Sequence, residues 1–105
     1  MSPSVALFAL ISALFYCLAM LVMKSWAAGP SLIGALLIAG ALLAAGAFEI
    51  AALRHERLGL IYVVILGAEV VVIAGISLFH FGETYSPREI AGIAIVLLGT
   101  AVAWA

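Results

Sequence analysis

The stretch Leu58–Phe79 decides the fold; it reads LGLIYVVILGAEVVVIAGISLF, and its one charged residue is Glu69. A helix of roughly 20 apolar residues crosses a bilayer core about 30 Å thick, and this run is close to that length. A lone strand is excluded in lipid because its backbone N–H and C=O groups would have no partners. The stretch therefore predicts a transmembrane helix with one ionisable side chain near its middle.

The composition of the whole chain agrees with this prediction. Of its 105 residues, 69% are hydrophobic and 9% are charged, whereas about a quarter of the residues in a soluble domain are charged. So few charges cannot cover a small soluble domain, and disordered chains have the opposite composition. Four Lys and Arg residues form no basic patch for nucleic acid, and the single cysteine, Cys17, cannot form an intramolecular disulfide. The composition predicts an integral membrane protein.

Polar segments divide the chain into four apolar runs. Lys24 and the pair Gly29-Pro30 close the first run, the segment 54–57 closes the second, and the segment 82–87 has the composition of a turn. We expect an all-α membrane protein, a single domain over residues 1–105 with four transmembrane helices. The helices are predicted at about 3–27, 31–53, 58–80 and 87–105.

The start of the last helix carries a recognisable signal. Ser86 is placed to cap the helix, Pro87 occupies its first position, and Glu89 follows three residues after the cap. A serine and a glutamate at this spacing predict a capping box.

The positive charges give no preferred orientation. In a four-span chain, Arg54 and Arg57 lie on one side of the membrane, and Lys24 and Arg88 lie on the other. Cytoplasmic loops normally carry the excess of Lys and Arg, and here the two sides are equal. Either the balance is chance in a chain with few charges, or copies insert both ways and pair antiparallel, an inverted symmetry that many transporters use.

Glu69 is the main functional candidate, because an ionisable residue inside a membrane is costly and usually functional. At 100° per residue, Tyr62 and His80 fall on its face of the helix, which reads Tyr62, Ile65, Glu69, Ile76 and His80. Two interpretations remain open. Glu69 is a proton- or cation-binding group that faces a cavity, or it is a protonated side chain with a structural hydrogen bond to another helix.

The first helix carries a stripe of small and polar residues at helical spacing. The stripe comprises Ala9, Ser12, Ala13, Tyr16, Ala19 and Met23. Tyr16 lies near mid-membrane, where a phenol needs a polar partner. We expect Ser12 and Tyr16 to line a pocket or Tyr16 to bond to Glu69; simple packing is the alternative.

The other acidic and small residues are expected to be structural. Glu49 lies near the end of the second helix, where it can reach the membrane surface or meet Arg54 or Arg57. In the fourth helix, Gly92 and Gly99 are seven residues apart and share a face, which predicts a helix-packing seam within the chain or between two copies. No metal-ligand cluster, phosphate-binding loop or nucleophile–base motif is recognisable, so we expect no cofactor and no enzyme activity.

The chain resembles the small multidrug resistance family of the drug/metabolite transporter superfamily along its whole length. Met23-Lys24 is similar to that family's Met-Lys ending of the first helix, and Gly59 with Tyr62 matches the Gly-x-x-Tyr opening of its third. The segment 81–83 resembles its Phe-Gly-Glu turn, and the Gly92 and Gly99 pair matches its fourth-helix dimer seam.

The resemblance implies an antiparallel dimer in the bacterial inner membrane. Such a dimer exports small cationic or hydrophobic compounds by alternating access, against proton entry. By the same resemblance, Tyr62 lines the binding chamber and Gly67 belongs to a kink of the third helix. The implied partners are the lipid bilayer, a second copy or a paralogous small membrane protein, and a small-molecule substrate.

Three departures from the family pattern concern the site itself. Tyr16 replaces the first-helix carboxylate, Ile65 replaces the third-helix tryptophan, and Glu69 replaces the second glycine of the kink. One interpretation is that the carboxylate has moved to Glu69. The others are a subunit of a flippase for a lipid-linked metabolite, and a non-transporting assembly subunit of a larger membrane complex.

Overall fold

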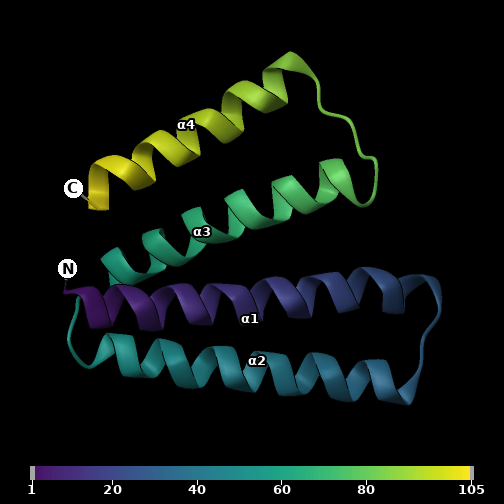
Figure 1. Ribbon diagram of the computed structural model, residues 1–105, viewed down its shortest axis with the longest axis horizontal. Coiled ribbons are helices and arrows are strands. Elements are labelled where there is room, and N and C mark those ends of the chain that lie inside the picture. The colour runs from purple at the N-terminus through teal and green to yellow at the C-terminus, as the bar shows by residue number, and fades with distance from the viewer. Residues whose placement is uncertain (1, 105) are drawn as a thin grey trace.

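The computed structural model describes residues 2–104, which form four α-helices joined by short turns (Figure 1). The helices are α1 (Pro3–Ala28), α2 (Leu32–Leu53), α3 (Leu58–Phe79) and α4 (Pro87–Trp104). The predicted all-α fold is confirmed, and the predicted ends that fall within the described residues are correct to one residue. The predicted last residue of the fourth helix, Ala105, lies outside the described residues.

All four helices are long and apolar enough to cross a membrane. At 1.5 Å per residue, the 22 residues of α3 give a length of about 33 Å, and the 18 residues of α4 give about 27 Å. Both lengths suit a hydrocarbon core of about 30 Å. The chain is a multi-pass integral membrane protein.

The helix starts follow the sequence. The Ser31 hydroxyl accepts a hydrogen bond of 3.0 Å from the Gly34 N–H at the start of α2. At the start of α4, the Ser86 N–H donates to Glu89 Oε1 at 2.8 Å, and the Glu89 N–H donates to Ser86 Oγ at 3.2 Å. The predicted capping box is therefore confirmed.

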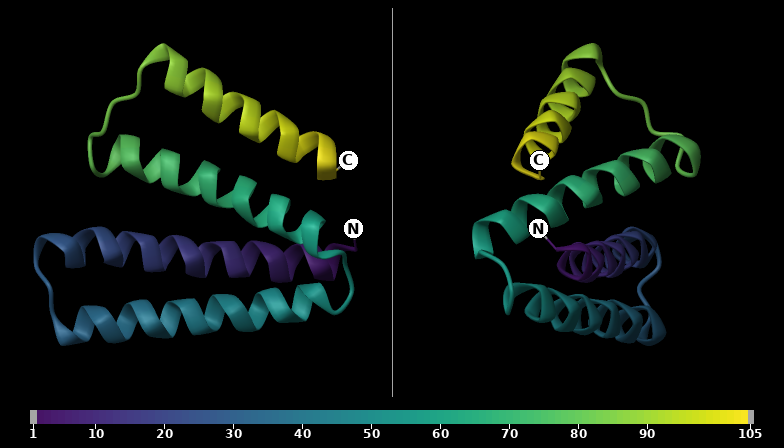
Figure 2. Two further views of the ribbon diagram at one scale, coloured as in Figure 1. Left: turned by 180° about the vertical axis from the view of Figure 1, so that it is seen from behind. Right: turned by 60° about the vertical axis from the view of Figure 1, so that its left-hand side comes forward.

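The helices lie side by side in a flat layer rather than in a closed bundle (Figures 1 and 2). The layer measures 40 × 36 × 17 Å. Consecutive helices run in opposite directions (Figure 1). Helix α1 packs against α2 and α3, whereas α4 contacts α3 alone among the described helices and has no buried residue. At one end of the layer, α4 is therefore held in place by only one neighbouring helix among those described.

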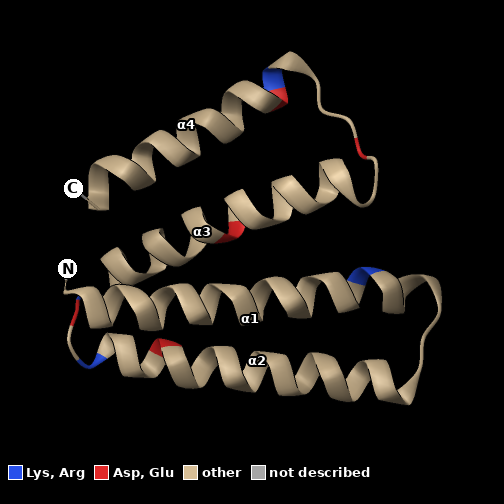
Figure 3. Cartoon of the chain, in the orientation of Figure 1, with Lys and Arg blue, Asp and Glu red and all other residues tan. Residues whose placement is uncertain are grey.

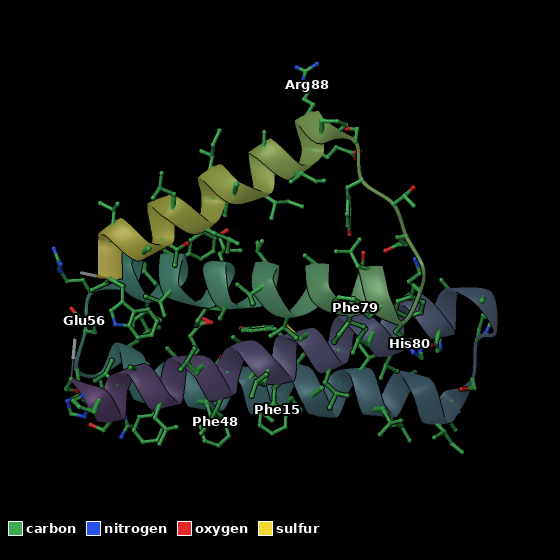
Figure 4. All side chains as sticks on the ribbon, turned by 45° about the horizontal axis from the view of Figure 1, so that its top comes forward. Phe15, Phe48, Glu56, Phe79, His80 and Arg88 are labelled. Carbon is green, nitrogen blue, oxygen red and sulfur yellow. The ribbon has the colours of Figure 1, made fainter. Side chains whose placement is uncertain are left out.

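Small residues bring α1 and α2 close together. Buried positions on α2 are Ala41, Ala45 and Ala52, and on α1 they include Ala9 and Ala13. Small side chains let helix backbones approach in lipid, where packing rather than water exclusion drives association. On the outer side of this hairpin, Phe15 and Phe48 stack with ring centres 5.7 Å apart (Figure 4).

Helices α3 and α4 meet at one close crossing. A methyl group added at Gly67 would collide with the Thr100 side chain, so the glycine allows this approach. Helix α3 continues through Gly67 without a break, and the kink implied by the family resemblance stays a prediction. A methyl group at Gly92 or Gly99 would meet nothing within 4 Å. Within residues 2–104 these two glycines therefore form no packing seam, and a seam between copies stays a prediction.

Apart from Glu69 in the middle of α3 and Glu49 within α2, the charged residues lie at or near the ends of the helices (Figure 3). Arg54 and Arg57 lie at the turn between α2 and α3, while Lys24 and Arg88 lie near the end of α1 and the start of α4. The alternating helix directions therefore put two positive side chains at each edge of the layer. Arg88 extends away from the other helices (Figure 4).

Candidate functional site

Four polar side chains from three helices face one cavity within the membrane-spanning layer. The cavity has a volume of about 350 Å³ and is lined by Tyr16, Glu49, Tyr62, Ile65, Leu66 and Glu69. The two carboxyl groups and Tyr16 are partly buried. As their spacing predicted, Tyr62, Ile65 and Glu69 share this face of α3. We refer to this space as the polar cavity.

Tyr16 and Glu49 are joined across the α1–α2 hairpin. The Tyr16 hydroxyl donates a hydrogen bond of 2.9 Å to Glu49 Oε1. Tyr16 lines the polar cavity, which was one of its expected positions, but its hydroxyl bonds to Glu49 and not to Glu69. The expected pairing of Glu49 with Arg54 or Arg57 is corrected, because the carboxyl group accepts from Tyr16.

The direction of helical side chains explains the pair. Long side chains lean toward the N-terminus of their own helix. In the antiparallel hairpin of α1 and α2, Tyr16 and Glu49 therefore lean toward each other. Glu49 also continues the buried row of Ala41 and Ala45 at a spacing of four residues, so it lies on the α1-facing side of α2.

Ser12 lies one turn before Tyr16 but does not line the polar cavity. It is fully buried, and its hydroxyl donates a hydrogen bond of 2.7 Å to the Ala45 carbonyl oxygen. The prediction that Ser12 lines the pocket is therefore wrong for this cavity, because Ser12 packs against α2 instead. Its hydroxyl already has a partner on α2.

Only part of the predicted α3 face lines the polar cavity. Tyr62 lines it although it is 61% exposed. Ile76 and His80 do not line this cavity, and His80 is an exposed residue at the end of α3. The members of the face that line the cavity are Tyr62, Ile65 and Glu69.

Glu69 also borders a second, mostly apolar cavity. This cavity has a volume of about 310 Å³ and shares Leu66 and Glu69 with the polar cavity. Its remaining lining comprises Met20, Val70, Ile73, Ala74, Tyr85 and Ile93. Glu69 therefore stands between a polar space and an apolar space.

A third cavity extends this space to the edge of the layer. It has a volume of about 220 Å³ and shares Met20 and Ile73 with the second cavity. At its far end it is lined by Lys24 and Glu83. The three cavities follow one another between α1 and α3, and we refer to them together as the α1–α3 groove.

The charge of the inner groove is acidic. Glu49 lines the polar cavity and Glu69 lines both the polar and the apolar cavity, and among the described residues no Lys or Arg lines either. Residues 2–104 contain no group of three His, Cys, Asp or Glu side chains that could hold a metal ion. The arrangement suits reversible binding of a proton or an organic cation, with apolar walls beside the carboxyl groups.

Sequence reasoning missed Glu49 as a site residue. Its nearness to the end of α2 suggested a surface position, and small residues occur nearly all round this helix, so no face stood out. The signal that could have identified it is its spacing of four residues from Ala45 and three from Ala52. Those two alanines are buried against the neighbouring helices.

The fold and the groove define the class of this chain as a four-helix, multi-pass membrane protein with a carboxylate-lined cavity inside its spans. No protein-family model, curated protein or solved structure matches the chain. The resemblance to the small multidrug resistance family therefore stays a prediction based on motifs.

Proposed function

We propose that this protein is a small transporter that exports a cationic or hydrophobic compound by alternating access, coupled to proton entry. The observation that carries the proposal is the polar cavity, where Glu49 and Glu69 lie with Tyr16 and Tyr62 inside the spans. Intramembrane carboxyl groups that face a cavity are typical of ion and substrate pathways.

Glu69 is the central residue of the proposal because it borders both the polar and the apolar cavity. A substrate with a cationic group and an apolar body would place its charge at Glu69 and its body against Leu66, Ile73 and Met20. Protonation of Glu69 would release the cation, since a neutral carboxyl group attracts it less. With one Glu69 in each subunit of the dimer proposed below, two protons enter for each singly charged cation that leaves, so the exchange moves net charge across the membrane.

The working unit is proposed to be an antiparallel dimer in the inner membrane. The helices form a flat layer (Figure 2), and a second layer stacked on it would enclose the groove. Gly92 and Gly99 on α4 have free space around them, which small residues at a helix–helix contact require. Equal positive charge at the two edges favours insertion both ways.

The test is transport by the purified protein in proteoliposomes. Addition of organic cations from a panel of quaternary and primary amines should produce pH-dependent currents. Glu69→Gln should reduce the current about 100-fold or more, because the amide cannot exchange a proton. The matched control is Glu56→Gln, at the turn between α2 and α3, which should leave the current unchanged. Full currents in Glu69→Gln would contradict the proposal.

A further inference from the structure

The loop between α3 and α4, residues 80–86, lies at one edge of the layer (Figure 1). Its residues Phe81 and Glu83 line the cavity at that end of the α1–α3 groove. We propose that this loop is the gate of the groove, with the Lys24–Glu83 ion pair as its latch and Tyr85 as the wall that closes the cavity next to Glu69. The inference rests on the proposed function only for what passes through the gate.

The latch joins the loop to the end of α1. Lys24 Nζ lies 2.8 Å from Glu83 Oε2 and 4.9 Å from the centre of the Phe81 ring. One ammonium group therefore holds the residues on both sides of Gly82. Gly82 has a φ of +64°, a left-handed conformation that glycine adopts without strain. The turn at Gly82 lets both neighbours reach the same cation.

The inner side of the loop is attached to α3 near the groove. Ser77 on α3 is 4% exposed. Its hydroxyl is hydrogen-bonded to the Tyr85 hydroxyl, and its carbonyl oxygen accepts a hydrogen bond of 3.0 Å from the Glu83 N–H. Glu83 and Tyr85 are therefore fixed to the same residue, so a movement of one is expected to move the other.

Tyr85 connects the loop to the candidate site. It lines the apolar cavity together with Glu69, Met20 and Ile73, although it lies outside the four helices. Loss of the latch at the membrane surface would therefore change the wall of the cavity that Glu69 borders. The chain of contacts runs from Lys24 through Glu83 to Tyr85.

The latch is weak enough to open. The side chains of Lys24 and Glu83 are 51% and 43% exposed, and exposed ion pairs contribute little stability. Breaking the pair is expected to raise the open fraction about two- to fivefold. Helix α4 can follow the loop because it contacts α3 alone among the described helices.

The test measures access to the groove and needs no substrate. Cys17 is replaced by alanine, and a single cysteine is introduced at Ile73, which lines both the apolar cavity and the cavity at the latch. In lipid nanodiscs, the rate of labelling by a charged, membrane-impermeant thiol reagent reports the opening. Ala74→Cys, a smaller change in the apolar cavity, is the second reporter position.

Lys24→Gln and Glu83→Gln should each raise the labelling rate about two- to fivefold, and the exchange Lys24→Glu with Glu83→Lys should return it toward the original rate. Tyr85→Ala should raise the rate more than Tyr85→Phe, which keeps the ring. Glu56→Gln is the matched control, since Glu56 lies 3.7 Å from Arg57 at the opposite edge. It should leave the rate unchanged.

The gate is disproved if the labelling rates at both reporter positions are unchanged in the latch variants, or if they rise in Glu56→Gln as much as in those variants. It is also disproved if the charge exchange behaves like the single variants.

The test also separates the gate from the proposed function. Labelling that depends on the latch in a protein that shows no transport would support the gate and reject the proposed function. Transport that depends on Glu69, without latch-dependent labelling, would support the proposed function and reject the gate.

Discussion

The α1–α2 hairpin and the α3–α4 pair are both two-helix units, but they are held together in different ways. In the hairpin, fully buried residues such as Ala9 and Ala45 form the interface, and the hydrogen bonds Ser12–Ala45 and Tyr16–Glu49 cross it. In the α3–α4 pair, α4 buries no residue, and the backbones approach closely where Thr100 faces Gly67.

The difference indicates which half of the molecule moves. A close-packed interface resists changes in helix position because its side chains interdigitate. A helix with one neighbour and no buried residue can shift at lower cost. Glu69 on α3 lines the polar cavity together with Tyr16 and Glu49 of the hairpin. In the proposed gate, the hairpin is therefore the fixed wall of the groove, and α4 with its loop is the movable one.

The largest effect is expected from overpacking the hairpin. Ala45→Leu adds three carbons at a fully buried position and should lower the free energy of unfolding by about 1–3 kcal/mol. The measurement is unfolding in mixed micelles followed by circular dichroism. Ala47→Leu is the matched control, because Ala47 is exposed on the same helix. Equal losses in both variants would show that the hairpin is not close-packed.

A smaller effect is expected at the crossing of α3 and α4. Gly67→Ala places a methyl group against Thr100 and should cost about 1 kcal/mol of unfolding free energy, because α4 can move aside. The control is Gly75→Ala on the same helix, where the added methyl meets nothing within 4 Å. If Gly67→Ala were as stable as Gly75→Ala, the crossing would not be a close contact.

The sequence was sufficient for the four helices because long apolar runs, interrupted by Lys24, Arg54–Arg57 and the turn before Pro87, leave little choice in lipid. The sequence also identified Glu69 as a candidate site residue, because it is the one charged residue in a long apolar run and stands out without knowledge of its contacts. The pairing of Tyr16 with Glu49 could not be predicted, because it depends on which face of α2 meets α1. That face is fixed by the packing of several alanines together, and the sequence marks small residues nearly all round α2.

The packing of α4 could not be predicted from the sequence either. Gly92 and Gly99 mark a face with room for another helix, but their spacing does not say whether that helix is in the same chain. For Gly67, the family resemblance implied a kink, which stays a prediction, and gave no sign of its close approach to Thr100. Both outcomes depend on the crossing geometry of α3 and α4, which local sequence patterns do not encode.

A further loss of hairpin stability should come from its buried hydrogen bond. Ser12→Ala removes the donor to the Ala45 carbonyl oxygen and should cost about 0.6 kcal/mol, the usual size of such bonds between membrane helices. Ser4→Ala is the control, since Ser4 is an exposed residue of the same helix. Unfolding in mixed micelles again provides the measurement, and identical midpoints for the two variants would mean that the bond contributes nothing.

The smallest effect is expected from a fall in pH, which should destabilise the α3–α4 loop but not the turn of the α1–α2 hairpin. In the loop between α3 and α4, the hydrogen bond from Lys24 lowers the pKa of Glu83. A carboxylate with a lowered pKa in the folded state stabilises that state fully above its unfolded pKa, about 4.3 for glutamate. This contribution is lost as the pH falls through the lowered folded-state pKa.

The loop should therefore stay protected from hydrogen exchange down to about pH 4 and lose protection below it. The α1–α2 turn, residues 29–31, contains no carboxylate and should keep its protection over the same range. Exchange followed by mass spectrometry, corrected for the intrinsic pH dependence, makes the comparison. In Glu83→Gln, the acid-dependent loss of protection in the loop should disappear, because the carboxylate that pairs with Lys24 is no longer there to be protonated. If that loss persists in Glu83→Gln, the ion pair is not its source, and the latch does not hold this unit in place.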